Sequence, residues 1–177
     1  SISSNNKITL LIKKVKDGKF SHYWFDKAKL NDLLRIEGPK GTFFLRDRAK
    51  PLVFLATGTG IAPIISILDG LDSDPDFNQI ENISLFWGNR VQQDFIWSPN
   101  FKKINVDFYP IVSKDDDDWN GEIGYVQDVA LRVLNNIKKV NVYACGASVM
   151  IDCAKSNFIK SGLNEKDFYS DKFVQSY

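Results

Sequence analysis

The sequence predicts an α/β protein in which a β-rich leading segment, residues 1–48, precedes a doubly wound parallel sheet in residues 49–177. Two observations predict this organisation. After Lys50, apolar runs of strand length alternate with segments whose apolar residues follow helical spacing. Before Asp47, β-branched stretches are separated by glycine turns, with one short helical interruption. The change of pattern between Asp47 and Lys50 marks the expected domain boundary.

The leading segment contains three stretches with strand character. They are Lys7–Val15, Leu33–Glu37 and Thr42–Leu45. Asp17-Gly18 provides a turn after the first stretch, and Gly38–Gly41 provides another after the second. Between these turns, Phe20–Phe25 is expected to form a short helix that Ser21 is placed to cap. We therefore expect residues 1–48 to be extended apart from this helix.

The following domain begins with Pro51–Pro63, around which the rest of the chain is organised. Leu52–Ala56 is an apolar run that suits a strand buried on both faces. Gly58 and Gly60 follow, and Ile61–Leu68 is then an apolar stripe of helical length. A strand, a glycine turn and a helix in this order place free backbone N–H groups at the positive end of a helix, where they can bind phosphate.

This turn by itself does not decide between packing and ligand binding. It lacks the third glycine of the ordinary dinucleotide-binding pattern, and a short glycine motif is tight packing about as often as a ligand site. Thr57 and Thr59 could add hydroxyl donors, and Pro63 stands in the first helical turn, where its missing N–H costs least.

The remainder of the chain repeats the strand and helix unit. Strands are expected at residues 82–88, 104–112, 140–145 and 167–170, and helices at residues 125–135 and 149–159. Such alternation predicts a parallel sheet that binds ligands at the carboxyl ends of its strands.

Composition excludes several classes of protein. The net charge is +1, which gives no electrostatic reason to expect nucleic acid as a partner. No apolar run reaches the roughly 20 residues that a membrane span needs. Cys145 and Cys153 are the 2 cysteines, too few for a disulfide scaffold, and we expect a reduced, cytoplasmic protein. Asp115–Asp118 lacks the spacing of a calcium loop, so we expect no metal site.

The string Ala56-Thr-Gly-Thr-Gly-Ile-Ala-Pro63 resembles the nucleotide-binding turn of the ferredoxin–NADP reductase superfamily. Four further segments resemble that family: Gly18–Ser21, Gly38–Gly41, Tyr143–Gly146 followed by Met150, and Phe168–Phe173. The resemblance implies a flavin-binding β-barrel domain beside a nucleotide-binding domain. It also implies hydride transfer from NADH or NADPH to FAD, with FMN as the alternative.

The same resemblance implies where the flavin binds. Gly18, Lys19, Phe20 and Ser21 match the segment that holds the flavin phosphate, and Ser1 matches a serine of the family's flavin motif. The arginine and tyrosine of that motif would lie upstream of Ser1. We therefore interpret residues 1–48 as the C-terminal part of an antiparallel β-barrel, and expect a longer chain or a partner to supply the rest.

The nucleotide site implied by the resemblance follows the central turn. Its residues are Thr57, Gly58, Thr59, Gly60, Ala62 and Pro63 at the pyrophosphate, and Cys145, Gly146 and Met150 beside the nicotinamide. By resemblance, Ser1, Cys145 and Asp171 are the candidate catalytic residues, and Phe173 could stack on the flavin or cap the core. From the residues alone, the favoured interpretation of Cys145 is a buried core cysteine, and Asp171 is as readily a solvated carboxylate as a catalytic one.

Arg90 is the candidate reader of the adenosine ribose. An arginine after the second strand can pair with a 2′-phosphate, but no second basic residue follows in Val91–Trp97, and Asp94 would repel a phosphate. This balance favours NADH and leaves NADPH open. Trp97 could stack on adenine or pack in the core.

The implied function is a flavoprotein oxidoreductase that reduces free flavin or passes electrons to an iron–sulfur or oxygenase acceptor protein. The alternative is a module that binds or senses pyridine nucleotide without turnover, or an electron-transfer subunit. A yellow protein that bleaches with NADH distinguishes the first hypothesis from the second.

Overall fold

The computed structural model describes residues 8–38, 40–75, 80–114 and 118–173. The chain forms two compact units, residues 2–42 and residues 43–177. We call them the leading unit and the sheet unit and describe each by itself.

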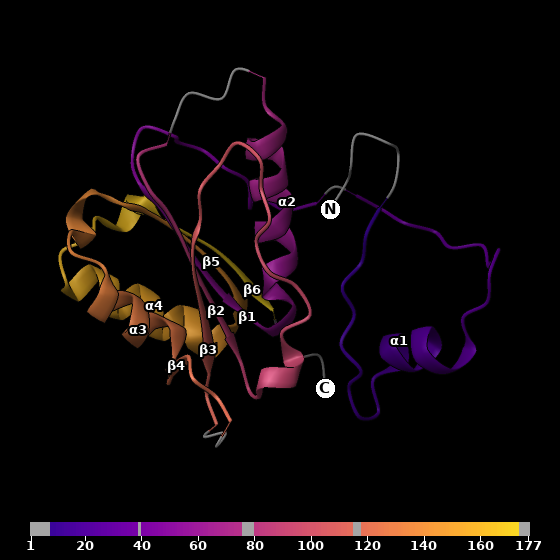
Figure 1. Ribbon diagram of the computed structural model, residues 1–177. Coiled ribbons are helices and arrows are strands. Elements are labelled where there is room, and N and C mark those ends of the chain that lie inside the picture. The colour runs from indigo at the N-terminus through magenta and orange to yellow at the C-terminus, as the bar shows by residue number, and fades with distance from the viewer. Residues whose placement is uncertain (1–7, 39, 76–79, 115–117, 174–177) are drawn as a thin grey trace. The chain divides into compact units, whose positions relative to one another are not determined.

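The sheet unit is built on six parallel strands, shown in Figure 1. They are β1 (Leu52–Thr57), β2 (Ile83–Asn89), β3 (Asp107–Val112), β4 (Glu122–Ile123), β5 (Asn141–Ala147) and β6 (Phe168–Phe173). Their order across the sheet is β4-β3-β2-β1-β5-β6. The chain therefore starts in the middle, moves to one edge, and returns to the other side of β1. The point between β1 and β5 is the topological switch point, where sheets of this class bind ligands.

Helices cover both faces of the sheet. α2 (Ile61–Ser73) lies on one face, and α3 (Val126–Val133) and α4 (Ser148–Lys160) lie on the other, as Figure 1 shows. α2 buries Ile61, Ile64, Leu68 and Leu71, a spacing that places one apolar stripe against the sheet. Single 3-10 turns connect other elements: η2 (Gly58–Gly60), η3 (Gln92–Asp94), η4 (Ile137–Lys139) and η5 (Glu165–Asp167).

The core between the sheet and the α3–α4 layer is made by alternate strand residues. Val53 and Leu55 of β1 and Phe86 of β2 pack with Val129 of α3 and Ile151 of α4. The predicted α/β class and doubly wound sheet are confirmed, with helix and strand ends within a few residues of those expected. β4 was not predicted, because a strand of two residues carries no periodic pattern.

The leading unit differs from the prediction. Its helix α1 (Lys19–His22) continues into a π-helical turn, η1 (Tyr23–Lys27). The stretches expected to be strands, in this unit and at the start of the sheet unit, form no ladder in the described residues 8–38 and 40–48. A β-strand requires a hydrogen-bonded neighbour, and no described segment of this region supplies one. Ser21 was also wrongly expected to cap the helix, because Gly18 is the N-cap and Ser21 lies inside α1.

Among the described residues, no helix is long and apolar enough to cross a membrane.

Candidate functional site

The loop that follows β1 has the backbone that a glycine turn allows. Gly58 has a φ of +52°, and a Cβ added there would meet nothing within 4 Å. The positive φ therefore selects glycine at this position, and the space in front of Gly58 is open. Thr59 is half-buried, and Gly60 is buried at the N-cap of α2.

Gly60 and Gly146 allow the loops after β1 and β5 to touch. A Cβ on Gly60 would lie 2.8 Å from Cα of Gly146 and would overlap the Cys145 carbonyl. A Cβ on Gly146, whose φ is +139°, would lie 2.9 Å from the Thr57 carbonyl oxygen and would overlap the Thr57 hydroxyl. Because Gly60 and Gly146 have no Cβ, the two strand–turn–helix units can pack closely against each other.

A hydrogen bond joins the same two loops. The backbone N–H of Ala147 donates to Oγ1 of Thr57 at 3.0 Å. The Thr57 hydroxyl keeps its proton as a donor, because a hydroxyl accepts and donates at the same time. The carboxyl ends of β1 and β5 are therefore fixed to each other at the switch point.

Two helices begin beside this junction without side-chain caps. α2 follows Gly60, α4 follows Ala147, and neither N-cap residue makes a side-chain hydrogen bond. Ala62 and Pro63 lie half-buried in the first turn of α2. Each uncapped helix start leaves backbone N–H donors and a positive dipole end, which together favour an anion.

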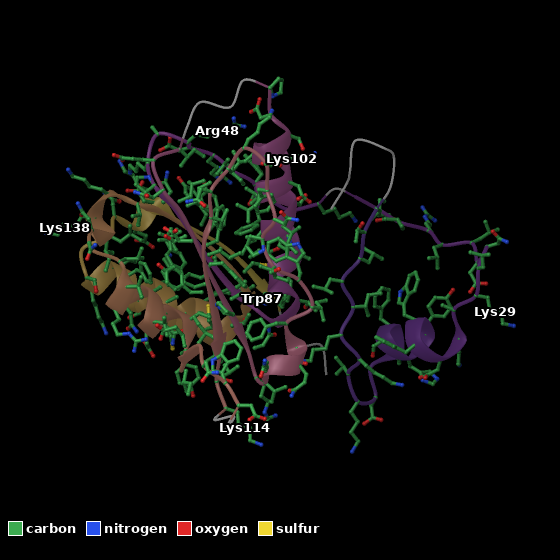
Figure 2. All side chains as sticks on the ribbon, in the orientation of Figure 1. Lys29, Arg48, Trp87, Lys102, Lys114 and Lys138 are labelled. Carbon is green, nitrogen blue, oxygen red and sulfur yellow. The ribbon has the colours of Figure 1, made fainter. Side chains whose placement is uncertain are left out.

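An indole group fixes the other side of the glycine loop. Nε1 of Trp87 donates to the Gly58 carbonyl oxygen at 3.0 Å, and Trp87 is 1% exposed. Its ring meets Phe95 edge-on at a centroid distance of 5.1 Å and Trp97 at 6.4 Å. Figure 2 labels Trp87 within the sheet unit.

An aromatic hollow of about 400 Å³ is lined by the segment that follows β2 and by residues of β3. Its lining residues include Phe95, Trp97, Phe108 and Trp119. Phe95 and Trp119 stack with ring centroids 5.5 Å apart. A larger cavity of about 790 Å³ lies at the amino edge of the sheet, beside Lys50 and Lys138, and contains none of the candidate site residues.

The pairing of β2 with β3 brings together polar residues that are distant in sequence. Asn89 and Arg90 accept backbone hydrogen bonds from Ser113 at 2.9 Å and Lys114 at 3.3 Å. Arg90 and Lys114 are exposed, so this edge carries two cations where the sequence indicated one. Nδ2 of Asn89 is buried without a partner. The serine and lysine directly after β3 were the signal that could have found this group.

The end of β5 carries a neutral thiol. Cys145 is fully buried, and burial, followed by the nearby Asp171 carboxylate, raises the pKa of its thiol to about 12. Cys145 and Asp171 face each other in the register of β5 and β6. Asp171 and Phe173 are exposed, and Met150 lies buried in the first turn of α4. The structure thus places these four residues near the carboxyl edge, with Cys145 unable to act as a thiolate.

The predicted flavin-phosphate segment is organised differently. The Ser21 hydroxyl accepts from the Val15 N–H at 3.1 Å and lies 3.1 Å from the Gly18 carbonyl, to which it can donate. Its hydroxyl is therefore used inside the turn, while Lys19 and Phe20 are exposed. Ser1 lies outside the described residues.

Comparison with known proteins identifies the family. The model of the oxidoreductase NAD-binding domain matches residues 54–156, and the model of the oxidoreductase FAD-binding domain matches residues 1–45. The chain belongs to the ferredoxin–NADP reductase superfamily. In this superfamily the two domain types named by the models occur together. The glycine loop after β1 and the end of β5 fall within the NAD-binding match, whereas Asp171 and Phe173 lie beyond it.

Two curated relatives are similar along almost the whole chain. The CDP-6-deoxy-L-threo-D-glycero-4-hexulose-3-dehydrase reductase of Yersinia pestis is 41% identical, over 97% of this chain and 53% of the relative. The anthranilate 1,2-dioxygenase electron transfer component of Acinetobacter baylyi is 27% identical, over 98% of this chain and 51% of the relative. The chain thus spans about half the length of these superfamily members.

Solved structures show the same fold. The CS-b5R domains of human Ncb5or superpose with a TM-score of 0.76 at 23% identity, over 96% of this chain and 53% of that one. A ferredoxin NADP+ reductase from Neisseria gonorrhoeae superposes with a TM-score of 0.68 at 20% identity, over 89% of this chain and 71% of that one. At these identities the likeness supports the superfamily fold.

Proposed function

We propose that this chain is part of an NAD(P)H-dependent flavoprotein reductase, in which residues 49–177 bind the pyridine nucleotide and residues 1–48 contribute to the flavin site. The observation that carries the proposal is the junction at the switch point. Two uncapped helix starts meet there, joined by the Thr57–Ala147 hydrogen bond, in a domain of the NAD-binding family.

The residues of this junction fit a dinucleotide pyrophosphate. Gly58 leaves open space in front of the loop, and the start of α2 supplies N–H donors that no side-chain cap occupies. Trp97 and Phe95 offer aromatic faces for the adenine in the neighbouring hollow. Gly58, Thr59, Ala62 and the first turn of α4 would hold the nucleotide.

Fewer side chains of the described residues are suited to contact a flavin. In the leading unit, Phe20 and Tyr23 pack edge-on around Trp24, and Nε1 of Trp24 is a buried donor without a partner. The predicted Ser21 hydroxyl is not free to bind a phosphate. The assignment of FAD, with FMN as the alternative, therefore rests on the family match to residues 1–45.

Bound together, the two cofactors supply hydride transfer from a reduced nicotinamide to a flavin. The chain's own residues then bind, orient and exclude water. Cys145 presents a neutral thiol beside Gly146, which adds no charge near the nicotinamide position. The exposed Asp171 carboxylate is the proposed proton carrier, and Ser1 and Phe173 remain proposed flavin contacts.

The proposal extends to the acceptor and the compartment. One relative is named as a dehydrase reductase and another as a dioxygenase electron transfer component, which supports an oxygenase or iron–sulfur protein as electron acceptor. Cys145 and Cys153 are free thiols, which supports a cytoplasmic location.

An anaerobic bleaching experiment tests the proposed function. The protein is purified with FAD, and NADH or NADPH is added while the visible flavin absorbance is followed. Bleaching within seconds supports the reductase. A protein that binds NADH in a fluorescence titration but never bleaches would contradict turnover and favour the sensing module. A protein that binds neither nucleotide would contradict both.

A further inference from the structure

The Trp87–Gly58 hydrogen bond has a consequence for how the nucleotide loop binds. We infer that Trp87 is a positioning residue for the coenzyme: its indole N–H holds the Gly58–Thr59 peptide in the orientation that presents the Thr59 N–H for binding. This inference rests on the proposed function, because it concerns the same loop, and it adds a residue that does not itself contact the coenzyme.

The first step concerns the peptide between Gly58 and Thr59. In a planar trans peptide, the carbonyl and the following N–H point in opposite directions. The Gly58 carbonyl points to Nε1 of Trp87, 3.0 Å away. The Thr59 N–H of the same peptide therefore points away from the indole. A flip of this peptide would turn a carbonyl oxygen, instead of a donor, toward a bound anion.

The second step concerns the freedom that this bond removes. Gly58 has a φ of +52° and no neighbour within 4 Å of its missing Cβ, so side-chain packing around Gly58 does not fix its conformation. Within the loop, the Gly58 carbonyl oxygen accepts from the Ile61 N–H at the end of η2. Glycine populates positive and negative φ about equally. The hydrogen bond from Trp87 is therefore a second constraint on this carbonyl, and it ties the loop to β2 before the ligand arrives. Such preorganisation raises affinity.

The third step concerns the rigidity of Trp87 itself. Its side chain is 1% exposed and packs edge-on against Phe95, with centroids 5.1 Å apart at 90°. Because Phe95 packs against it, the Trp87 indole cannot rotate away from the Gly58 carbonyl without disrupting the packing beside β2. The donor is thus held in place by the sheet unit, independently of the loop that it constrains.

The test compares two variants that each remove one side-chain-to-backbone hydrogen bond while keeping an aromatic ring. Trp87→Phe removes the donor to Gly58. Tyr143→Phe is the matched control, because the Tyr143 hydroxyl accepts from the Arg46 N–H at the same distance of 3.0 Å, and Tyr143 is also fully buried. Both variants and the wild type are loaded with FAD and mixed with NADH in stopped flow, and their thermal unfolding is recorded.

We expect Trp87→Phe to raise the half-saturating NADH concentration by about 3–10-fold, the effect of one hydrogen bond, while the limiting rate of flavin reduction stays unchanged. Tyr143→Phe should change neither. An unchanged half-saturating concentration in Trp87→Phe would overturn the inference. An equal rise in both variants that follows their loss of thermal stability would also overturn it, since a purely structural role predicts that result.

A second readout needs no coenzyme. In ¹⁵N-labelled protein without nucleotide, Trp87→Phe should shift the Thr59 amide resonance, whereas Tyr143→Phe should leave it in place. An unmoved Thr59 amide would overturn the inference even if NADH binding changed. If Trp87→Phe shifts the Thr59 amide but the wild-type protein binds no NADH, the proposed function is contradicted instead.

Discussion

Thr57 and Ala147 are 90 residues apart in the chain and are joined by a hydrogen bond of 3.0 Å between the Ala147 N–H and the Thr57 hydroxyl. This bond connects the ends of the neighbouring strands β1 and β5 at the switch point of the sheet. The two helices that begin beside it, α2 and α4, therefore present their N-termini to the same region. The nucleotide site that we propose depends on this junction.

Replacing Gly146 by alanine should open the junction. The new Cβ would overlap the Thr57 hydroxyl, and the φ of +139° is unfavourable for alanine. We expect Gly146→Ala to lower the free energy of unfolding by about 2–4 kcal/mol in urea denaturation. Gly70→Ala is the control, because Gly70 lies in α2 with nothing within 4 Å, and there alanine should add about 0.5–1 kcal/mol. Equal stability of the two variants would contradict the packing role of Gly146.

Lys114 should distinguish the two coenzymes. Its backbone is bonded to that of Arg90, so both cations lie at the edge where a 2′-phosphate would be read. We expect Lys114→Ala to weaken NADPH binding by about 3–10-fold, because the variant loses a partly screened charge pair with the 2′-phosphate. NADH binding should weaken by less than about 2-fold. Lys138→Ala, beside the amino-edge cavity and at the left of the sheet unit in Figure 2, should change neither dissociation constant. Equal losses for both coenzymes in Lys114→Ala would show that Lys114 does not contact the 2′-phosphate.

The buried Cys145 thiol should be unreactive and should make stability depend on pH in the alkaline range. Its folded pKa of about 12 lies above the ordinary value of 9.0, so the folded protein keeps a proton that the unfolded chain loses. The resulting stabilisation is complete below pH 9 and is lost as the pH rises toward 12. At pH 8 the native protein should release colour from Ellman's reagent through the exposed Cys153, and a Cys153→Ala variant should react only after denaturation. Rapid native labelling of Cys153→Ala would contradict the assignment.

Asp171 should affect the rate of flavin reduction more than cofactor content. It is exposed on β6, opposite Cys145 in register, so its removal leaves the core intact. We expect Asp171→Ala to slow NADH-dependent flavin reduction by about 100-fold in stopped flow, the lower end of the range of general acid–base contributions. Flavin content should be retained. Wild-type rates in this variant would remove Asp171 from the catalytic set.

The sequence predicted the sheet unit well because its elements carry strong local patterns. Leu52–Ala56 reads as a buried strand, and the apolar spacing of Val126–Val133 reads as a helix, so neither needed tertiary information. The strands expected in residues 8–48 were wrong because strand formation depends on a neighbour that local sequence does not specify. Ser21 was misplaced because capping depends on the residue at which a helix begins.

Within the candidate site, the sequence located the glycine turn but not its surroundings. The donation from Trp87 to Gly58 and the approach of Lys114 to Arg90 arise from strand pairing between distant segments. Gly60 was predicted as a ligand contact, and its buried backbone also shows a packing role that a motif cannot reveal. These relationships follow from the sheet order and register.

An NMR titration with NAD⁺ tests the central claim most directly. In ¹⁵N-labelled, flavin-loaded protein, NAD⁺ should shift the backbone amides of residues 58–62 and 147–150, at the two helix starts beside the Thr57–Ala147 bond. Amides of residues 133–140, beside the amino-edge cavity, should remain in place. Shifts confined to residues 133–140, or saturating binding without any shift in residues 58–62, would contradict the account.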